Sequence, residues 1–237
     1  MVKLKVFAAI AVMALSTPAL ALQATPVSRP VVNLPAIIDG PALVGPAPTI
    51  DSARAAADRL ATHPIVPADR LAQAVADEPW TPWVAMHPVF GDSFVEGRLP
   101  RTARVFQDVL NAIGPVIGAT KNANDRRRPM YADPHVVQCD ALDPQVQAQS
   151  SFPSGHSTGG WAWALVMAEL VPQRADAILQ RGRDFGDSRV ICGYHFPSDI
   201  EAGRMLAAGT IARLHADPNF RRDLDAARRE LAHAYPH

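Results

Sequence analysis

The most constraining feature of the sequence is residues 153–171, a segment of helix length that is apolar on nearly all of its sides. Such a helix has no face for water, so other elements must surround it. The rest of the chain shows no convincing alternation of apolar and polar residues over a strand length. We therefore expect an all-α fold, a helical bundle of one domain in which this helix is central.

Further helices are indicated by prolines and capping residues at their starts and by apolar residues at helical spacing. Gly114-Pro115 is expected to kink the longest of them, and residues 80–83 are interpreted as a turn. The arginines and glutamines of residues 172–190 are expected to face outward. The predicted ranges are 51–61, 67–77, 100–120, 172–190, 196–215 and 217–231.

The first 21 residues have the pattern of a signal peptide. Lys3 and Lys5 precede a short apolar stretch, and Ala19-Leu20-Ala21 is a cleavage site of the small-x-small type. We expect cleavage after about Ala21 and a periplasmic or secreted protein; a short N-terminal anchor is the alternative. Residues 22–50 are rich in proline and are expected to be extended, without chemistry of their own. Residues 51–237 are the predicted all-α domain, and none of its segments is apolar and long enough to span a membrane.

Formal charge is balanced, with 23 basic and 23 acidic residues. A nucleic-acid partner would require a basic stripe, and none is evident. Removal of the signal peptide leaves Lys121 as the only lysine. All other cations of the mature chain are arginines, which sets Lys121 apart.

The sequence contains two cysteines, Cys139 and Cys192. An even number of cysteines in an exported chain favours one disulfide between them. Two buried thiols are the alternative.

The start of the apolar helix has the composition of an anion site. Pro153 suits the first helical position. The N–H groups of Ser154, Gly155 and His156 are then expected to converge on one point at the positive end of the helix dipole, where phosphate is the usual ligand. The alternative is an ordinary capped helix that begins near a histidine.

Three cations outside this helix fit the same ligand. Lys121, Arg128 and Arg189 could surround a phosphoryl group, which carries spread negative charge in its transition state. A catalytic metal is not expected, because these cations would repel it, although the spacing of His195 and Asp199 is compatible with ligation.

Two histidines supply the remaining chemistry of phosphomonoester hydrolysis, a nucleophile and an acid for the leaving group. Asp199 follows His195 by four residues, at the expected entry to a helix. That spacing lets the carboxylate hold one ring nitrogen and leaves the other free to attack.

Together these segments resemble the three-part phosphatase motif of the type-2 phosphatidic acid phosphatase and vanadium haloperoxidase superfamily. From about residue 90 onward, with Val190-Ile191-Cys192-Gly193-Tyr194-His195, the chain is similar to the class A bacterial nonspecific acid phosphatases. Two positions depart from that pattern: Ser150 stands where the family has glycine, and Ser157 where it has threonine. The three parts are Lys121-x6-Arg128-Pro129, Pro153-Ser154-Gly155-His156 and Ser188-Arg189-x5-His195-x3-Asp199.

The resemblance implies an exported phosphomonoesterase that uses no metal or cofactor, often oligomeric, acting on nucleotides and on aryl and sugar phosphates. It implies that His195 attacks phosphorus, that Asp199 orients it, and that His156 protonates the leaving group and later activates water. The implied phosphate ligands are Lys121, Arg128, Ser154, Gly155 and Arg189.

Four alternatives stay open at this point. Phosphotransfer to an alcohol is compatible with the same residues. A lipid phosphatase would usually have several membrane spans, and a vanadate-dependent haloperoxidase a much longer chain. The non-enzymatic alternative is a periplasmic oxyanion-binding protein.

Overall fold

The computed structural model describes residues 36–62, 64–136, 138–140, 145 and 148–236. All of them belong to the compact unit Val32–His237. Every regular element in these ranges is a helix, which confirms the all-α prediction. The expected signal peptide and the residues up to 35 lie outside the described part.

Every predicted helix is present within a few residues of its expected bounds. The structure also contains helices that were not predicted, among them α1, α4 and α6. The 3-10 helices are written η. The elements are α1 Gly40–Val44, α2 Ala53–Leu60, α3 Ala68–Ala76, α4 Pro82–Phe90, η1 Glu96–Arg98, α5 Pro100–Asn122, α6 Pro129–Ala132, α8 Gly155–Leu170, η2 Pro172–Arg174, α9 Ala175–Ile191, α10 Pro197–Leu214 and α11 Pro218–Ala234.

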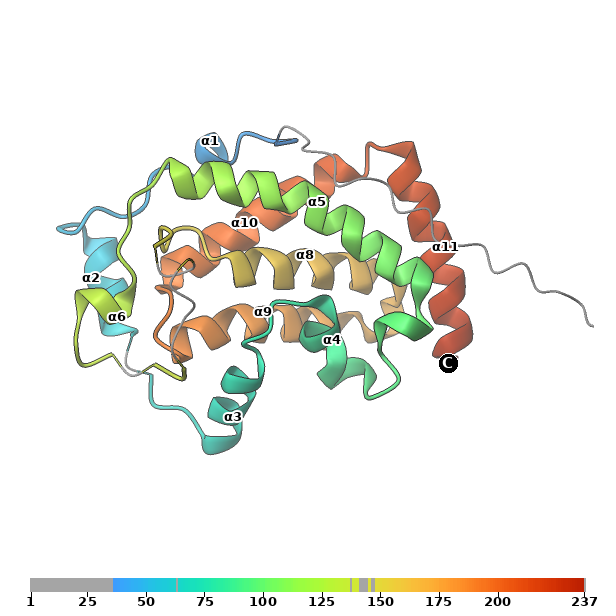
Figure 1. Cartoon of the computed structure of the whole chain (residues 1–237), viewed down its shortest axis with the longest axis horizontal. Coiled ribbons are helices and arrows are strands. Elements are labelled where there is room, and N and C mark those ends of the chain that lie inside the picture. Colours follow the sequence, from blue (N-terminus) through green and yellow to red (C-terminus); the bar gives the residue numbers. More distant parts are fainter. Residues whose placement is uncertain (1–35, 63, 137, 141–144, 146–147, 237) are drawn as a thin grey trace, which may run out of the picture. The chain divides into compact units, whose positions relative to one another are not determined.

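Helix α8 is the centre of the bundle, as its apolar sequence predicts. It packs mainly against α9 and α10, and also contacts α5, α4 and α11 (Figure 1). Trp163, Val166 and Met167 on α8 are fully buried. Glycines allow α8 and α9 to approach closely: a Cβ atom on Gly160 would lie 2.6 Å from Cδ1 of Phe185 on α9. This close contact fixes the position of the helices that carry the site.

Two elements differ from expectation. Residues 80–83 are not a simple turn but the start of α4: the Thr81 hydroxyl accepts the N–H of Val84 at 3.1 Å, and Pro82 occupies the first turn. Within the proline-rich segment, Asp39 caps the short helix α1 through the N–H of Ala42 at 3.0 Å. Both starts have a cap followed by proline, a signal that we overlooked.

The expectation that all arginines of residues 172–190 face outward is wrong. Arg181 is buried and donates from Nη1 to the Asp77 carboxylate at 3.0 Å. The Ser188 hydroxyl donates to the same carboxylate at 2.6 Å. A buried carboxylate requires such donors, so Asp77 at the end of α3 fastens α3 to α9.

The predicted disulfide is present. Cys139 is bonded to Cys192, 53 residues further along the chain. The Tyr194 hydroxyl adds two bonds to the backbone of Asp140, accepting its N–H at 2.8 Å and donating to its carbonyl at 2.7 Å. The loop before α8 is therefore held to the segment that follows α9.

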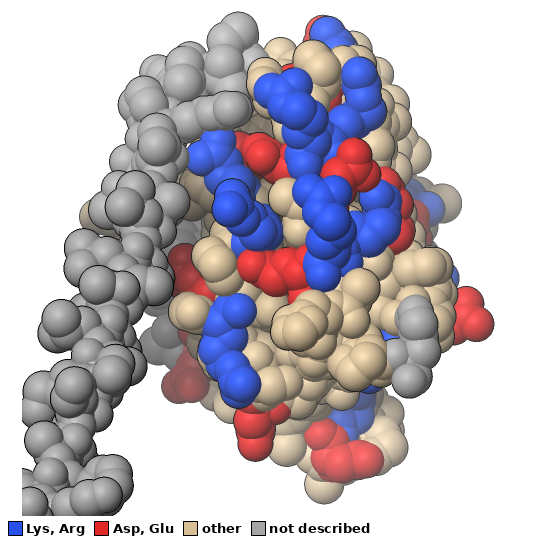
Figure 2. Space-filling model, turned by 90° about the vertical axis from the view of Figure 1, so that its right-hand side faces the viewer, with Lys and Arg blue, Asp and Glu red and all other residues tan. Residues whose placement is uncertain are grey.

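No helix in the described ranges has both the length and the apolar character needed to cross a bilayer. The face on the α11 side of the bundle carries many basic residues with acidic residues between them (Figure 2). Arg228, for example, pairs with Asp225 at 2.7 Å and with Glu169 at 3.1 Å. This face is mixed in charge and is not a continuous basic stripe.

The helix contact generates the first prediction. Gly182→Ala places a methyl group against Cβ of Ala164, and should lower the free energy of unfolding by roughly 1–3 kcal/mol through overpacking. Gly118→Ala is the matched control, because a Cβ there meets nothing within 4 Å. It should stabilise the helix by about 0.5–1 kcal/mol. Urea denaturation measures both, and equal effects would contradict the packing argument.

Candidate active site

The predicted site residues come from five separate segments, and the structure brings them together. Lys121 lies in the last turn of α5, and Arg128 in the extended segment that follows. His156 lies in the first turn of α8, and Arg189 in the last turn of α9. His195 precedes α10.

The tautomer of His195 follows from its neighbours. Nη1 of Arg128 lies 3.2 Å from Nε2, and a guanidinium can only donate, so Nε2 accepts. The ring proton is then on Nδ1, which lies 3.3 Å from Oδ2 of Asp199. Burial is the main cause that lowers the pKa of His195, to about 3. The ring is therefore neutral, and its lone pair is on Nε2, where it accepts from Arg128.

Asp199 is fully buried in the first turn of α10. Its Oδ2 accepts the N–H of Phe196 at 2.8 Å and the Ser151 hydroxyl at 2.6 Å. Burial acts to raise the pKa of the carboxyl group, but the interaction with His195, the charge of Arg126 and the bond from Ser151 outweigh it and leave the pKa at about 2. Asp199 is thus a charged acceptor for the His195 proton.

Lys121 and Arg128 supply positive charge next to His195. Arg128 is buried and also donates from Nη1 to the carbonyl of Tyr194 at 3.1 Å. Nζ of Lys121 donates to the carbonyl of Ser150 at 2.6 Å. Burial, followed by repulsion from Arg128, lowers the pKa of Lys121 to about 7. The charge of Lys121 therefore depends on pH in the neutral range.

Arg189 is buried against α3 and the ring of Tyr194. Its Nη2 donates to the carbonyl of Ala74 at 2.6 Å, and the guanidinium carbon lies 5.3 Å from the ring centre. Its Nε is buried and has no acceptor among the described residues.

The start of α8 differs from expectation. The helix begins at Gly155, Ser154 is the cap, and Pro153 precedes both in a cis peptide with Phe152. The N–H of Ser154 donates to the carbonyl of Asp199 at 3.0 Å, so the expected convergence of three N–H groups is wrong for Ser154. Gly155 and His156 occupy the first helical positions, whose N–H groups have no acceptor within the helix. A Cβ on Gly155 would meet nothing within 4 Å, so this end of the helix is open to a ligand.

His156 is oriented by a backbone group. Nε2 lies 2.8 Å from the carbonyl of Glu78, which can only accept, so Nε2 carries a proton and Nδ1 is the atom that can exchange one. The ring lies against Phe185, with centres 5.5 Å apart, and near Trp80. Burial, followed by the charge of Arg189, lowers the pKa of His156 to about 3.

Sequence reasoning missed Arg126 and Asp58. Nη1 of Arg126 donates to Oδ1 of Asp199 at 2.6 Å, and Nη2 donates to Asp58 at 2.7 Å. A signal was present for Arg126: it is spaced two residues from Arg128, and alternate residues of an extended segment share one side. Arg127 between them is exposed. Asp58 offered no comparable signal.

The departure at Ser150 has a structural explanation. None of the described residues other than glycine has a positive φ angle, so this position does not require glycine. The Ser150 hydroxyl accepts the N–H groups of Arg126 and Phe152, each at 3.2 Å. The hydroxyl thus stabilises the loop before α8.

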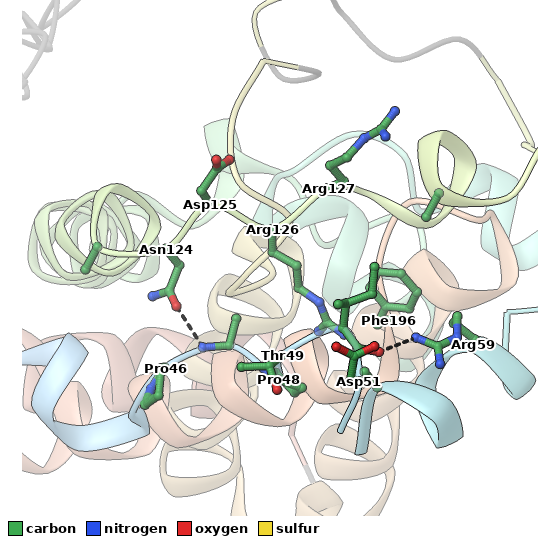
Figure 3. Close-up of a pocket in the computed structure, with 15 residues that line it drawn as sticks. Pro46, Pro48, Thr49, Asp51, Arg59, Asn124, Asp125, Arg126, Arg127 and Phe196 are labelled. Carbon is green, nitrogen blue, oxygen red and sulfur yellow. Dashed lines mark hydrogen bonds between the residues drawn. The ribbon is translucent and has the colours of Figure 1, made fainter. Parts of the chain in front are cut away.

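A cavity of about 730 Å³ lies on another side of Arg126, between residues 46–51 and 123–127 (Figure 3). The guanidinium of Arg126 stacks on Phe196 at its wall, 4.1 Å from the ring centre. The residues that line the cavity include neither His156 nor His195. The described ranges contain no group of three or more His, Cys, Asp or Glu residues placed to hold a metal ion.

Comparison with known proteins gives matches to phosphatases. Residues 109–223 match the family model described as the PAP2 superfamily. The chain is 45% identical over 138 residues to the acid phosphatase of Zymomonas mobilis, covering 58% of this chain and 52% of that protein. It is 38% identical over 152 residues to the non-specific acid phosphatase of Providencia stuartii, covering 62% and 60%.

A more distant match is the lipid A 1-phosphatase of Rhizobium johnstonii, 34% identical over 95 residues, or 40% of this chain and 39% of that protein. The matches thus span about half to three fifths of the two acid phosphatases. Residues 109–223 are thus similar to the PAP2 superfamily, in a chain that resembles the bacterial non-specific acid phosphatases.

Proposed function

We propose that the protein is a metal-independent acid phosphatase that hydrolyses phosphate monoesters through a phosphohistidine at His195. The observation that carries the proposal is the fixed tautomer of His195. Its proton lies on the side of Asp199, and the lone pair of Nε2 lies beside Arg128. A nucleophile for phosphorus needs this arrangement, whereas binding alone does not.

In the first step, Nε2 of His195 forms a bond to phosphorus as the bond from phosphorus to the ester oxygen breaks. The departing oxygen takes a proton from Nδ1 of His156. Positive charge develops on the His195 ring, and the carboxylate of Asp199 at 3.3 Å stabilises it. In the second step, His156 takes a proton from water, which attacks phosphorus and releases inorganic phosphate and neutral His195.

The proton donor must be charged at the start, and the free site disfavours this because burial, and after it the charge of Arg189, lowers the pKa of His156 to about 3. A bound phosphate monoester adds negative charge between Lys121, Arg128 and Arg189. That charge offsets the repulsion on His156 and raises its pKa in the complex. Substrate binding thus prepares the acid.

The proposed contacts all reach the phosphoryl group. Lys121, Arg128, Arg189, Ser154 and the Gly155 amide hold its oxygens. Because no contact in this set reads the alcohol portion, broad specificity follows, including nucleotides and aryl and sugar phosphates. An alcohol could replace water in the second step, which would give phosphotransferase activity.

The proposal includes a periplasmic or secreted location and a homo-oligomer. The Cys139–Cys192 disulfide fits an oxidising compartment, and so supports the periplasmic or secreted location inferred from residues 1–21. A homo-oligomer remains a prediction from the family resemblance.

The test of function separates the two histidines. His195→Ala should abolish phosphoenzyme formation with every monoester. His156→Ala should slow alkyl phosphates by roughly 10²–10⁴-fold, yet still phosphorylate His195 from an aryl phosphate with a good leaving group. Its phosphoenzyme should then persist, because His156 also activates water.

Rapid-quench measurement with aryl and alkyl substrates checks these expectations. A burst from His195→Ala and none from His156→Ala would reverse the two roles. Phosphate binding without any burst in the wild type would instead favour an oxyanion-binding protein.

The charge of Lys121 predicts a pH dependence. Lysine is charged below its pKa, here about 7, so inhibition by sulfate should weaken as pH rises through about 7. Sulfate is chosen because its own charge is constant over this range. The Lys121→Arg variant should keep its affinity for sulfate at higher pH than the wild type, because a guanidinium stays charged. Identical pH profiles for wild type and Lys121→Arg would show that another group is responsible.

Metal independence is tested with a chelator. Hydrolysis of an aryl phosphate should survive dialysis against EDTA, because cations of the protein neutralise the phosphate. Vanadate should inhibit, since its five-coordinate adduct on His195 resembles the transition state. Loss of activity that a divalent ion restores would refute the metal-free mechanism, and vanadate-dependent oxidation of halide by peroxide would favour the haloperoxidase alternative.

A further inference from the structure

Arg126 connects the site to a second buried carboxylate. Its guanidinium lies between Asp199 and Asp58, donating to Oδ1 of the first at 2.6 Å and to Oδ2 of the second at 2.7 Å. The Asp58 side chain is 2% exposed and that of Arg126 is 9% exposed. An ion pair so well shielded is sensitive to the loss of either partner.

Asp58 belongs to α2, outside the PAP2 match at residues 109–223. Besides Arg126, its carboxylate accepts the N–H of Ser198 at 3.0 Å, at the start of α10. The Ser198 hydroxyl donates to Asp58 and accepts from Arg126 at 2.6 Å. Asp58 therefore fixes both Arg126 and the helix turn that carries Asp199.

The backbone of Arg126 supports the same carboxylate from the other side. Its carbonyl accepts the N–H of Ser151 at 2.8 Å, and the Ser151 hydroxyl donates to Oδ2 of Asp199 at 2.6 Å. Both oxygens of Asp199 thus depend on Arg126, one directly and one through Ser151.

We propose that Asp58 and Arg126 are positioning residues for catalysis, which hold the Asp199 carboxylate in place and set the charge that faces His195. This inference rests on the proposed function and extends it to α2. Asp58, Arg126 and Asp199 together carry one net negative charge. That charge stabilises the cationic ring of phosphorylated His195, and without Asp58 the three positions would be neutral.

The main variant is Asp58→Asn, which keeps the shape and removes the charge. Phosphoenzyme formation should slow by roughly ten- to a hundredfold. KM should change little, because neither residue is among the proposed phosphate ligands. A purely structural role would lower stability without this separation of kcat from KM.

Glu201→Gln is the matched control. Glu201 on α10 pairs with Arg54 on α2, and both side chains are more than half exposed. This change removes another ion pair between α2 and α10. It leaves intact the hydrogen bonds that connect Asp58 to Asp199 through Arg126. Urea denaturation reports the effect of each variant on stability, and only Asp58→Asn should slow the burst.

The cavity beside Arg126 allows a second test, which also serves if Asp58→Asn does not fold. Arg126→Ala would enlarge the cavity where the guanidinium now stacks on Phe196. Millimolar guanidinium should enter and restore part of the burst, whereas sodium chloride at the same concentration should not. Guanidinium should not restore the burst of Asp58→Asn, because Arg126 is intact in that variant.

The outcomes are separable. A wild-type burst with an equally fast burst in Asp58→Asn, or equal slowing in Glu201→Gln, would overturn the positioning role and leave the phosphatase intact. Full activity of Arg126→Ala without guanidinium would do the same. Absence of a burst in the wild type would overturn the proposed function and this inference with it.

Discussion

The structure depends on the burial of one charged carboxylate, that of Asp199. A buried carboxylate is tolerated only where donors replace water. Its donors come from separate parts of the chain: the Phe196 amide, the Ser151 hydroxyl, Arg126 and His195. The arrangement that makes the charge tolerable therefore also gathers the loop before α8, the segment after α5 and the start of α10. The backbone carbonyl of Asp199 adds the start of α8 by accepting the N–H of Ser154.

Around this carboxylate the protein accumulates cations that repel one another. Lys121 shows the cost most directly, because burial and Arg128 bring its pKa down to about 7. A bound anion would relieve this repulsion, which is why we propose phosphate as the ligand. Before an anion binds, the surrounding packing has to hold the cations in place. The Cys139–Cys192 disulfide and the buried Asp77 do this by fastening a loop and α3 to the end of α9.

Local signals predicted the helical fold, because caps and apolar periodicity are properties of neighbouring residues. The roles of the site residues, which motif spacing indicated, stay predictions. Local signals failed where distant partners decide the structure. Asp58 is one acidic residue in an ordinary amphipathic helix, and only the tertiary fold places it against Arg126. The N–H of Ser154 was expected to be free, but an acceptor 45 positions away, the carbonyl of Asp199, takes it. The burial of Arg181 likewise depends on Asp77, which its own helix does not reveal.

The contacts that α3 and the turn after it make with the site have a consequence for how the protein can vary. His156 is oriented by the carbonyl of Glu78, and Arg189 by the carbonyl of Ala74. Every amino acid carries the same carbonyl group, so substitutions at these two positions can leave the bonds intact. A deletion that shifted the backbone of residues 74–78 by one position would break both. Relatives could therefore preserve this support through the length and path of the chain alone, and sequence identity would not record it.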